Sequence, residues 1–110
     1  MFEKDLRIGF LLDFYGDVLS DRKRTVLDAY YNQDLSLSEI AGDVGISRQG
    51  VRELIKKAEE ELRFYEERLG LAARFREAQR QAERLLQLLR EKGADDEIFR
   101  AAECLAASIR

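Results

Sequence analysis

A short basic segment carries the side chains of this chain that are best suited to binding chemistry. Residues 48–57 include four basic residues and one acidic residue, whereas residues 59–67 include five glutamates and one arginine. Arginine can donate two hydrogen bonds to guanine, glutamine can pair with adenine, and lysine can hold a phosphate. The residues that we expect to contact a nucleic acid are Ser47, Arg48, Gln49, Arg52, Lys56 and Lys57.

The residues before and within this segment predict the element that presents it. Ser36 followed by Glu39 has the spacing of a capping box, which begins a helix, and Gly45 suits the left-handed conformation that ends one. Ser47 is then a suitable N-cap for a second, longer helix. This order is typical of a helix-turn-helix. Gly50, in the first turn of the second helix, has two open explanations: close approach of a backbone or phosphate, or substitution without consequence.

The longer helix should bury one face and expose the other. Apolar residues recur along it at steps of three and four, which predicts a buried stripe. The expected members of that stripe are Val51, Leu54, Ile55, Ala58, Leu62, Tyr65 and Leu69. The run Glu59–Glu61 is interpreted as a solvated face of the same helix rather than a site of paired carboxylates.

Two further helices are expected before the helix-turn-helix. Residues 3–16 contain two apolar rows at helical spacing, with Glu3 and Asp5 in the first turn, and such a pattern implies burial on two sides. One row should meet the core, and the other should meet either the C-terminal helices or a second subunit, which favours a homodimer. Ser20 predicts the N-cap of a helix over residues 21–31. The tyrosines at 15, 30 and 31 stand beside leucines and are interpreted as core residues rather than a platform for bases.

After Gly70, which should interrupt the helical run, two more helices are predicted. Residues 71–92 have an apolar seam of Phe75, Ala78, Ala82, Leu85 and Leu89, widened by Leu86 and Leu88. A helix over 96–109 should turn one side inward, made of Ile98, Ala101, Ala102, Leu105 and Ile109. The two could form an antiparallel hairpin or a dimer interface. The expected organisation is therefore a helix-turn-helix domain at 1–70 and a C-terminal helical extension at 71–110.

Composition sets the fold class and limits the chemistry. The 110 residues include no proline and 37% charged residues, which favours an all-α helical bundle. There is no histidine, no cysteine cluster and no glycine-rich phosphate loop, so we expect neither an enzyme nor a bound metal or cofactor. The net charge of −3 argues against a strong non-specific nucleic-acid binder.

The single cysteine and the hydropathy of the chain bear on its compartment. Cys104 cannot form an internal disulfide, and its alanine-rich surroundings predict a buried structural thiol. No apolar run is long enough to insert into a membrane, and residues 1–10 do not resemble a signal peptide. These observations favour a cytoplasmic protein.

Three stretches resemble a known family when they are taken together: LLDFYGDVLSDRKR at 11–24, LDAYYNQDLSLSEIAGDVGISRQGV at 27–51 and IKKAEEELRFYEERLGL at 55–71. They resemble the YlxM-type (UPF0122) family of small bacterial helix-turn-helix proteins, and residues 36–62 are similar to region four of sigma factors. The likeness covers residues 1–71. It implies a regulatory role in the signal recognition particle pathway, with the particle's protein, RNA or receptor as partners.

Two functions follow from the sequence. The first is a regulatory protein that binds DNA or RNA through the second helix of the motif. The second is a protein-interaction adapter that uses the same fold, the acidic half of the long helix and the C-terminal helices.

Overall fold

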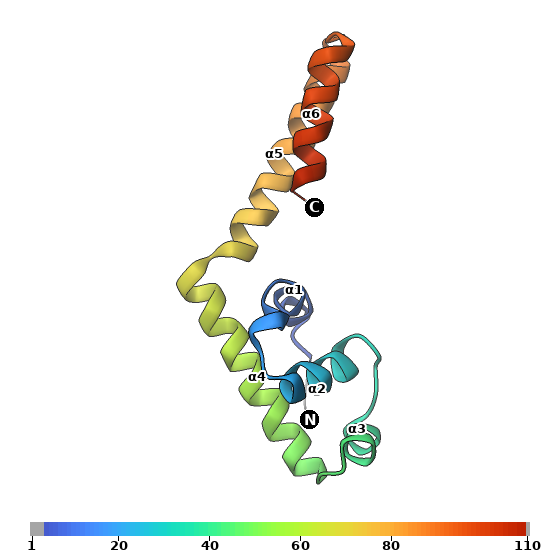
Figure 1. Cartoon of the computed structure of the whole chain (residues 1–110), viewed down its shortest axis with the longest axis vertical. Helices are drawn as coiled ribbons and strands as arrows, with labels where there is room; N and C mark the ends of the chain where they lie inside the picture. The colour runs from blue at the N-terminus through green and yellow to red at the C-terminus, as the bar shows by residue number, and fades with distance from the viewer. Residues whose placement is uncertain (1–3, 110) are drawn as a thin grey trace. The chain divides into compact units, whose positions relative to one another are not determined.

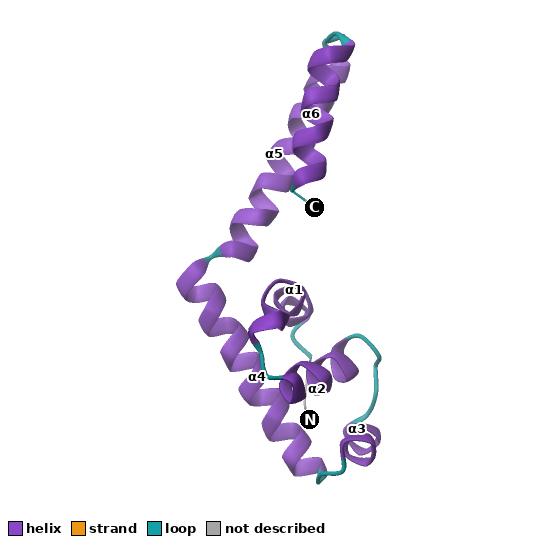
Figure 2. Ribbon diagram, in the orientation of Figure 1, coloured by secondary structure: helices purple, strands orange, loops and turns teal. Residues whose placement is uncertain are grey.

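The computed structural model describes residues 4–109, and within them every regular element is a helix (Figures 1 and 2). The all-α prediction is therefore confirmed. The elements in chain order are α1 (Leu6–Tyr15), the 3₁₀-helix η1 (Gly16–Val18), α2 (Asp21–Tyr31), α3 (Leu37–Val44), α4 (Arg48–Leu69), α5 (Leu71–Glu91) and α6 (Asp96–Ser108). The chain divides into two compact units, the first ending at Gly70 and the second beginning at Leu71.

The first unit is organised around α4, which packs against α1, α2 and α3. Val51, Ile55 and Leu62 of α4 have no exposed surface, and they meet fully buried residues of the other helices, among them Ile8, Val26 and Leu27. Burying an aliphatic side chain of this size stabilises the fold by about 1.5–3 kcal/mol. Val51, Ile55, Ala58 and Leu62 of the predicted stripe are buried, whereas Leu54 and Tyr65 are only partly buried and Leu69 is exposed.

Helix α1 buries one of its two apolar rows within this unit. Ile8, Leu11, Leu12 and Tyr15 are buried, as the sequence pattern predicts. In the other row Leu6 is exposed, and Phe10 and Phe14 are partly buried and contact each other edge to face. Asp5 is the N-cap rather than a first-turn residue, and its side chain accepts a hydrogen bond from the backbone N–H of Arg7. Glu3 lies outside the described residues.

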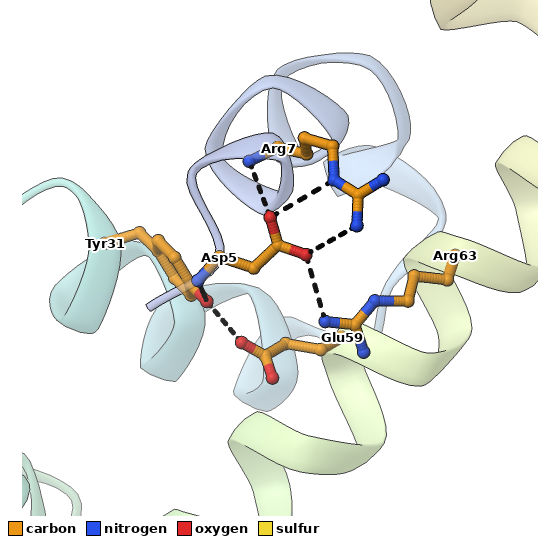
Figure 3. A network of polar contacts seen from close by, with 5 residues as sticks. All are labelled: Asp5, Arg7, Tyr31, Glu59 and Arg63. Carbon is orange, nitrogen blue, oxygen red and sulfur yellow. Dashed lines mark hydrogen bonds and ion pairs between the residues drawn. The ribbon is translucent and has the colours of Figure 1, made fainter. Parts of the chain in front are cut away.

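A network of polar side chains joins the start of α1 to α2 and α4 (Figure 3). The hydroxyl of Tyr31 donates to the carboxylate of Glu59 and accepts from the backbone N–H of Asp5 at 3.1 Å. The Asp5 carboxylate also accepts from Arg7 and, at 3.4 Å, from Arg63. These arginines lower the pKa of Asp5 to about 2, with the hydrogen bonds from Arg7 as the largest cause. Burial, followed by the bond to Glu59, raises the pKa of Tyr31.

The glutamates at the C-terminal half of α4 are not a uniformly solvated face, so that interpretation was wrong. Glu59 is buried against Tyr31. Glu61 accepts from Lys23 at 2.9 Å and from Tyr65 at 3.1 Å, and the bond from Lys23 is the main cause that lowers its pKa. Glu66 accepts from the Tyr15 hydroxyl at 2.7 Å. The sequence could not predict these hydrogen bonds, because Tyr31, Lys23 and Tyr15, which donate them, are distant in sequence from the glutamates.

Tyr15 and Tyr30 are buried and Tyr31 is partly buried, so their interpretation as core residues is confirmed.

In the second unit, α6 returns along α5 as an antiparallel hairpin (Figure 1). Gly93, with φ +65°, ends α5, and the Asp95 side chain caps α6 by accepting from the N–H of Ile98 at 3.0 Å. The shared core consists of Ala82, Leu86, Ala102 and Ala106, with Leu89, Phe99 and Ile109 packed against it.

The faces predicted for these two helices are partly wrong. Leu85, Ile98 and Leu105 were expected inside and are exposed, and so is Ala101. The packed positions are instead the residues that follow these four: Leu86, Phe99, Ala102 and Ala106. Small side chains such as alanine allow two helices to pack closely, which explains why this line is the one in contact. Cys104 is exposed as well, which corrects its assignment as a buried thiol.

Replacing Tyr31 with phenylalanine should lower the free energy of unfolding by about 1–3 kcal/mol, because the buried Glu59 carboxylate loses a hydrogen-bond donor. The matched control is Tyr65→Phe, which makes the same chemical change beside Glu61. Glu61 keeps its bond to Lys23, so the control should lose much less. Urea unfolding followed by circular dichroism measures both; equal losses would contradict the role given to the Tyr31–Glu59 pair.

Candidate nucleic-acid interface

The turn between α3 and α4 has the predicted geometry. The Ser36 Oγ accepts from the N–H of Glu39, and the Glu39 carboxylate accepts from the N–H of Ser36, both at 3.1 Å. Gly45 has φ +79°, and its N–H donates to the carbonyl of Ala41 at 2.9 Å. Ser47 begins α4, its Oγ accepting from the N–H of Gly50 at 2.9 Å. These bonds satisfy backbone groups that the helix ends leave without partners.

A side chain at position 50 would have little space, because the preceding turn lies against Gly50. A Cβ built there would stand 3.2 Å from the Ser47 Oγ and 3.5 Å from the Ile46 Cδ1. Both atoms belong to side chains of the preceding turn, so the close neighbours of Gly50 within the chain are not backbone atoms.

The six sequence-predicted residues all lie at the start of α4 and all are exposed. Arg48, Arg52 and Lys56 follow one another at four-residue steps and form one row along the helix. Gln49 and Lys57 belong to the neighbouring row, in which Glu53 stands between them. From residue 48 to residue 57 the helix rises by roughly 14 Å. The buried stripe of α4 turns this two-row surface outward.

Ion pairing distinguishes this surface from most other basic residues of the first unit, with Arg22 and Arg68 as exceptions. Ion pairs join Lys4 to Asp34, Arg7 and Arg63 to Asp5, Lys23 to Glu61, and Arg24 to Asp17 and Asp21. By contrast, Arg48, Lys56 and Lys57 make no ion pair with any residue between 4 and 109. Their charge is available to a ligand outside the described chain.

The first unit also contains a groove of about 420 Å³ that the sequence did not predict. Leu12, Ala29, Ile40 and Val44 supply apolar walls, and carboxylates of Asp13, Asp17, Asp28 and Asp43 line it as well. Arg24 is its one basic lining residue and is paired with Asp17 at 3.1 Å. Since the lining comes from α1, η1, α2, α3 and the connector after α2, no local sequence signal could have found it.

Two features are absent from residues 4–109. No helix there is long and apolar enough to cross a membrane. The same residues hold no group of three or more cysteine, aspartate or glutamate side chains that could bind a metal ion.

A capped short helix, a left-handed glycine and a second helix with an exposed basic start define the class: this is an all-α helix-turn-helix protein. Residues 2–102 match the model of the family described as "Putative helix-turn-helix protein, YlxM / p13 like", and the chain belongs to that UPF0122 family. The match extends beyond residue 71, where the likeness found from sequence motifs ended.

Curated relatives agree with this assignment. A UPF0122 protein of Thermoanaerobacter sp. strain X514 is 40% identical over 107 residues, which cover 94% of this chain and 92% of the relative. A UPF0122 protein of Bacillus cereus strain AH187 is 44% identical over 92 residues, covering 84% of each chain.

Replacing Gly42 of α3 and Gly45 of its cap with alanine should change the free energy of unfolding in opposite directions. At both positions the added methyl group would have no other atom within 4 Å, so neither change causes a steric clash. Gly45→Ala should lower the free energy of unfolding by about 1–2 kcal/mol, because alanine resists the left-handed conformation. Gly42→Ala, in ordinary helical conformation, should raise it by about 0.5–1 kcal/mol. Thermal unfolding of both variants measures the difference. A stabilising Gly45→Ala would show that the turn does not need its left-handed residue.

Proposed function

We propose that this chain is a regulatory protein that binds DNA or RNA through the start of α4, and that it acts by binding rather than by catalysis. The observation that carries the proposal is the exposed row of Arg48, Arg52 and Lys56 on the second helix of a helix-turn-helix. In proteins with this motif the second helix enters the major groove with its N-terminal residues toward the bases.

Within this proposal the residues have different roles. Arg48, Gln49 and Arg52 reach base edges or phosphates, and Lys56 and Lys57 hold phosphates and fix the register. Ser47 ends the turn and keeps the first N–H groups of α4 in place. The exposed carboxylates of Glu60 and Glu67 repel the nucleic-acid backbone beyond Lys57, which confines the contact to about three helical turns.

The finer part of the proposal concerns the target and the assembly state. The family resemblance associates the chain with the signal recognition particle pathway, whose RNA, protein or receptor would be the physiological partner. The protein is also proposed to act as a homodimer, because a surface of this small charge gains affinity when two copies bind together.

Replacing Arg48 and Arg52 with alanine should abolish detectable binding of nucleic acid while leaving helicity unchanged. For the unchanged protein, about four phosphate contacts predict a slope of about −3.6 when log affinity for duplex DNA is plotted against log salt concentration. Fluorescence anisotropy with labelled DNA and RNA duplexes measures both quantities.

The control for this experiment removes the same charge elsewhere. Lys92 and Arg100 are exposed and lie in the second unit, so Lys92→Ala with Arg100→Ala should preserve affinity. If both double variants bind like the unchanged protein at low salt, the start of α4 is not the contact surface.

One observation favours a second function, that of a protein-interaction adapter. The groove of the first unit combines apolar walls with four aspartates, of which Asp17 is paired with Arg24 and Asp28 accepts from Asn32 and Gln33. Asp13 and Asp43 remain to complement an amphipathic segment bearing lysine or arginine. This moves the adapter surface away from the acidic half of α4, where Glu59, Glu61 and Glu66 are already engaged.

Crosslinking in cells separates the two functions. RNA or DNA crosslinks identified by sequencing should disappear in the Arg48→Ala, Arg52→Ala variant and persist in Asp13→Lys, Asp43→Lys. Protein crosslinks identified by mass spectrometry should show the reverse dependence if the groove binds a basic segment. Protein crosslinks that survive the aspartate changes would remove the groove from the adapter function.

A further inference from the structure

One acidic residue lies inside the basic surface at the start of α4. Glu53 follows Gln49 by four residues and precedes Lys57 by four, so these three side chains form a single row along the helix. All three are exposed. A ligand that covers both rows of this surface therefore also covers the Glu53 carboxylate.

The Glu53 carboxylate has no partner among the residues between 4 and 109. Lys56 and Lys57 stand three and four residues further along the helix, where a lysine can reach a glutamate, yet neither forms an ion pair with it. Glu59 and Glu61 differ, because each accepts a hydrogen bond from a side chain of α2. The hydrogen-bonding capacity of Glu53 is therefore available to a ligand.

A carboxylate restricts what that ligand can present. An ionised carboxylate accepts hydrogen bonds and donates none, and covering it without a donor leaves a desolvated charge, which is strongly unfavourable. Phosphate oxygens repel it. In a duplex, the donors that face the major groove are the exocyclic amino groups of cytosine (N4) and adenine (N6), whereas guanine and thymine present acceptors there. A carboxylate at this place therefore favours a base that carries an amino group.

The place of Glu53 along α4 puts it at the level of base edges. The N-terminal part of the second helix of a helix-turn-helix is the part that faces the bases. Glu53 directly follows Arg52 and lies one turn beyond Gln49, and both of these residues are assigned to base edges above. Four residues of helix rise roughly 6 Å, and base pairs follow one another at roughly 3.4 Å. The bases that Gln49 and Glu53 contact should therefore be about two base pairs apart.

Such a contact requires a groove that a helix can enter. The major groove of B-form DNA admits an α-helix. The major groove of an RNA duplex is deep and narrow, and side chains cannot read the bases in it. The amino groups that suit Glu53 are therefore accessible in duplex DNA rather than in duplex RNA.

We propose that Glu53 is a specificity-determining residue, which accepts a hydrogen bond from the exocyclic amino group of a cytosine or an adenine in the major groove of duplex DNA. This inference rests on the proposed function, because it requires that the start of α4 binds nucleic acid, and it names duplex DNA as the target. Glu53 then has two opposite effects. Its charge weakens contact with any polyanion, and its hydrogen bond favours sequences that place an amino group beside it.

Selection from a library of randomised DNA duplexes, followed by sequencing of the bound fraction, tests this role in the full chain. Glu53→Ala should lose the preference for one base pair that the unchanged protein selects and should keep the preferences at other positions.

A selected duplex is then compared with a copy in which the cytosine or adenine of that pair is replaced by 2-pyrimidinone or purine, which lack the amino group. Fluorescence anisotropy should show that the unchanged protein binds the copy at least about fivefold more weakly. Glu53→Ala should bind both duplexes equally, and the analogue that has this effect identifies which of the two bases is read.

The matched control is Glu60→Ala. Glu60 is also an exposed glutamate of α4 but lies beyond Lys57, so this variant removes the same charge outside the contact surface. It should leave every base preference unchanged and should bind the selected duplex more tightly than its copy, as the unchanged protein does. Circular dichroism should show that both variants keep the helicity of the unchanged protein.

The possible failures are distinguishable. If the unchanged protein binds no duplex, the proposed function is overturned and the role of Glu53 with it. If it binds with base preferences that Glu53→Ala leaves intact, or if removing the amino group weakens both proteins equally, only the role of Glu53 is overturned. Tighter binding of RNA than of DNA, lost in Glu53→Ala, would assign the hydrogen bond to a 2′-hydroxyl group and would overturn the target named here.

Discussion

Burial of a single face of α4 is the constraint on which the first unit depends. Val51, Ile55, Ala58 and Leu62 are completely enclosed, and three other helices supply the atoms that enclose them. Because a helix has a fixed period, fixing this stripe also fixes the direction of every other side chain on α4. The basic row beginning at Arg48 is exposed for that reason, and the same packing brings Glu59 to Tyr31.

Part of the charge of the first unit is engaged in contacts between its own residues. The carboxylates of Asp5, Glu59, Glu61 and Glu66 accept hydrogen bonds from side chains on other elements. The basic residues elsewhere in the unit are largely committed to such contacts, whereas Arg48, Lys56 and Lys57 are not paired within the described chain. A protein with negative net charge can therefore have a local cationic surface. Because salt screens distant charges, a polyanion bound there interacts mainly with this local charge rather than with the net charge.

The two units use different means of stabilisation. The first has a core of large aliphatic and aromatic side chains, joined by polar contacts such as the Tyr31–Glu59 pair. The second packs alanines between two helices and leaves its larger aliphatic residues on one exposed side.

The sequence by itself determined the local structure. Ser36, Glu39, Gly45 and Ser47 specify helix ends through bonds to backbone groups a few residues away, so the helix-turn-helix could be read without knowledge of the fold. Tertiary structure alone decided the partners of Glu59 and Glu61, the groove lined by four elements, and which side of the C-terminal hairpin is packed. These depend on contacts between residues far apart in the chain. In α5 and α6 the apolar face is wider than the packed line, so periodicity alone does not say which edge of it is packed, and the close fit of the alanines selects that edge.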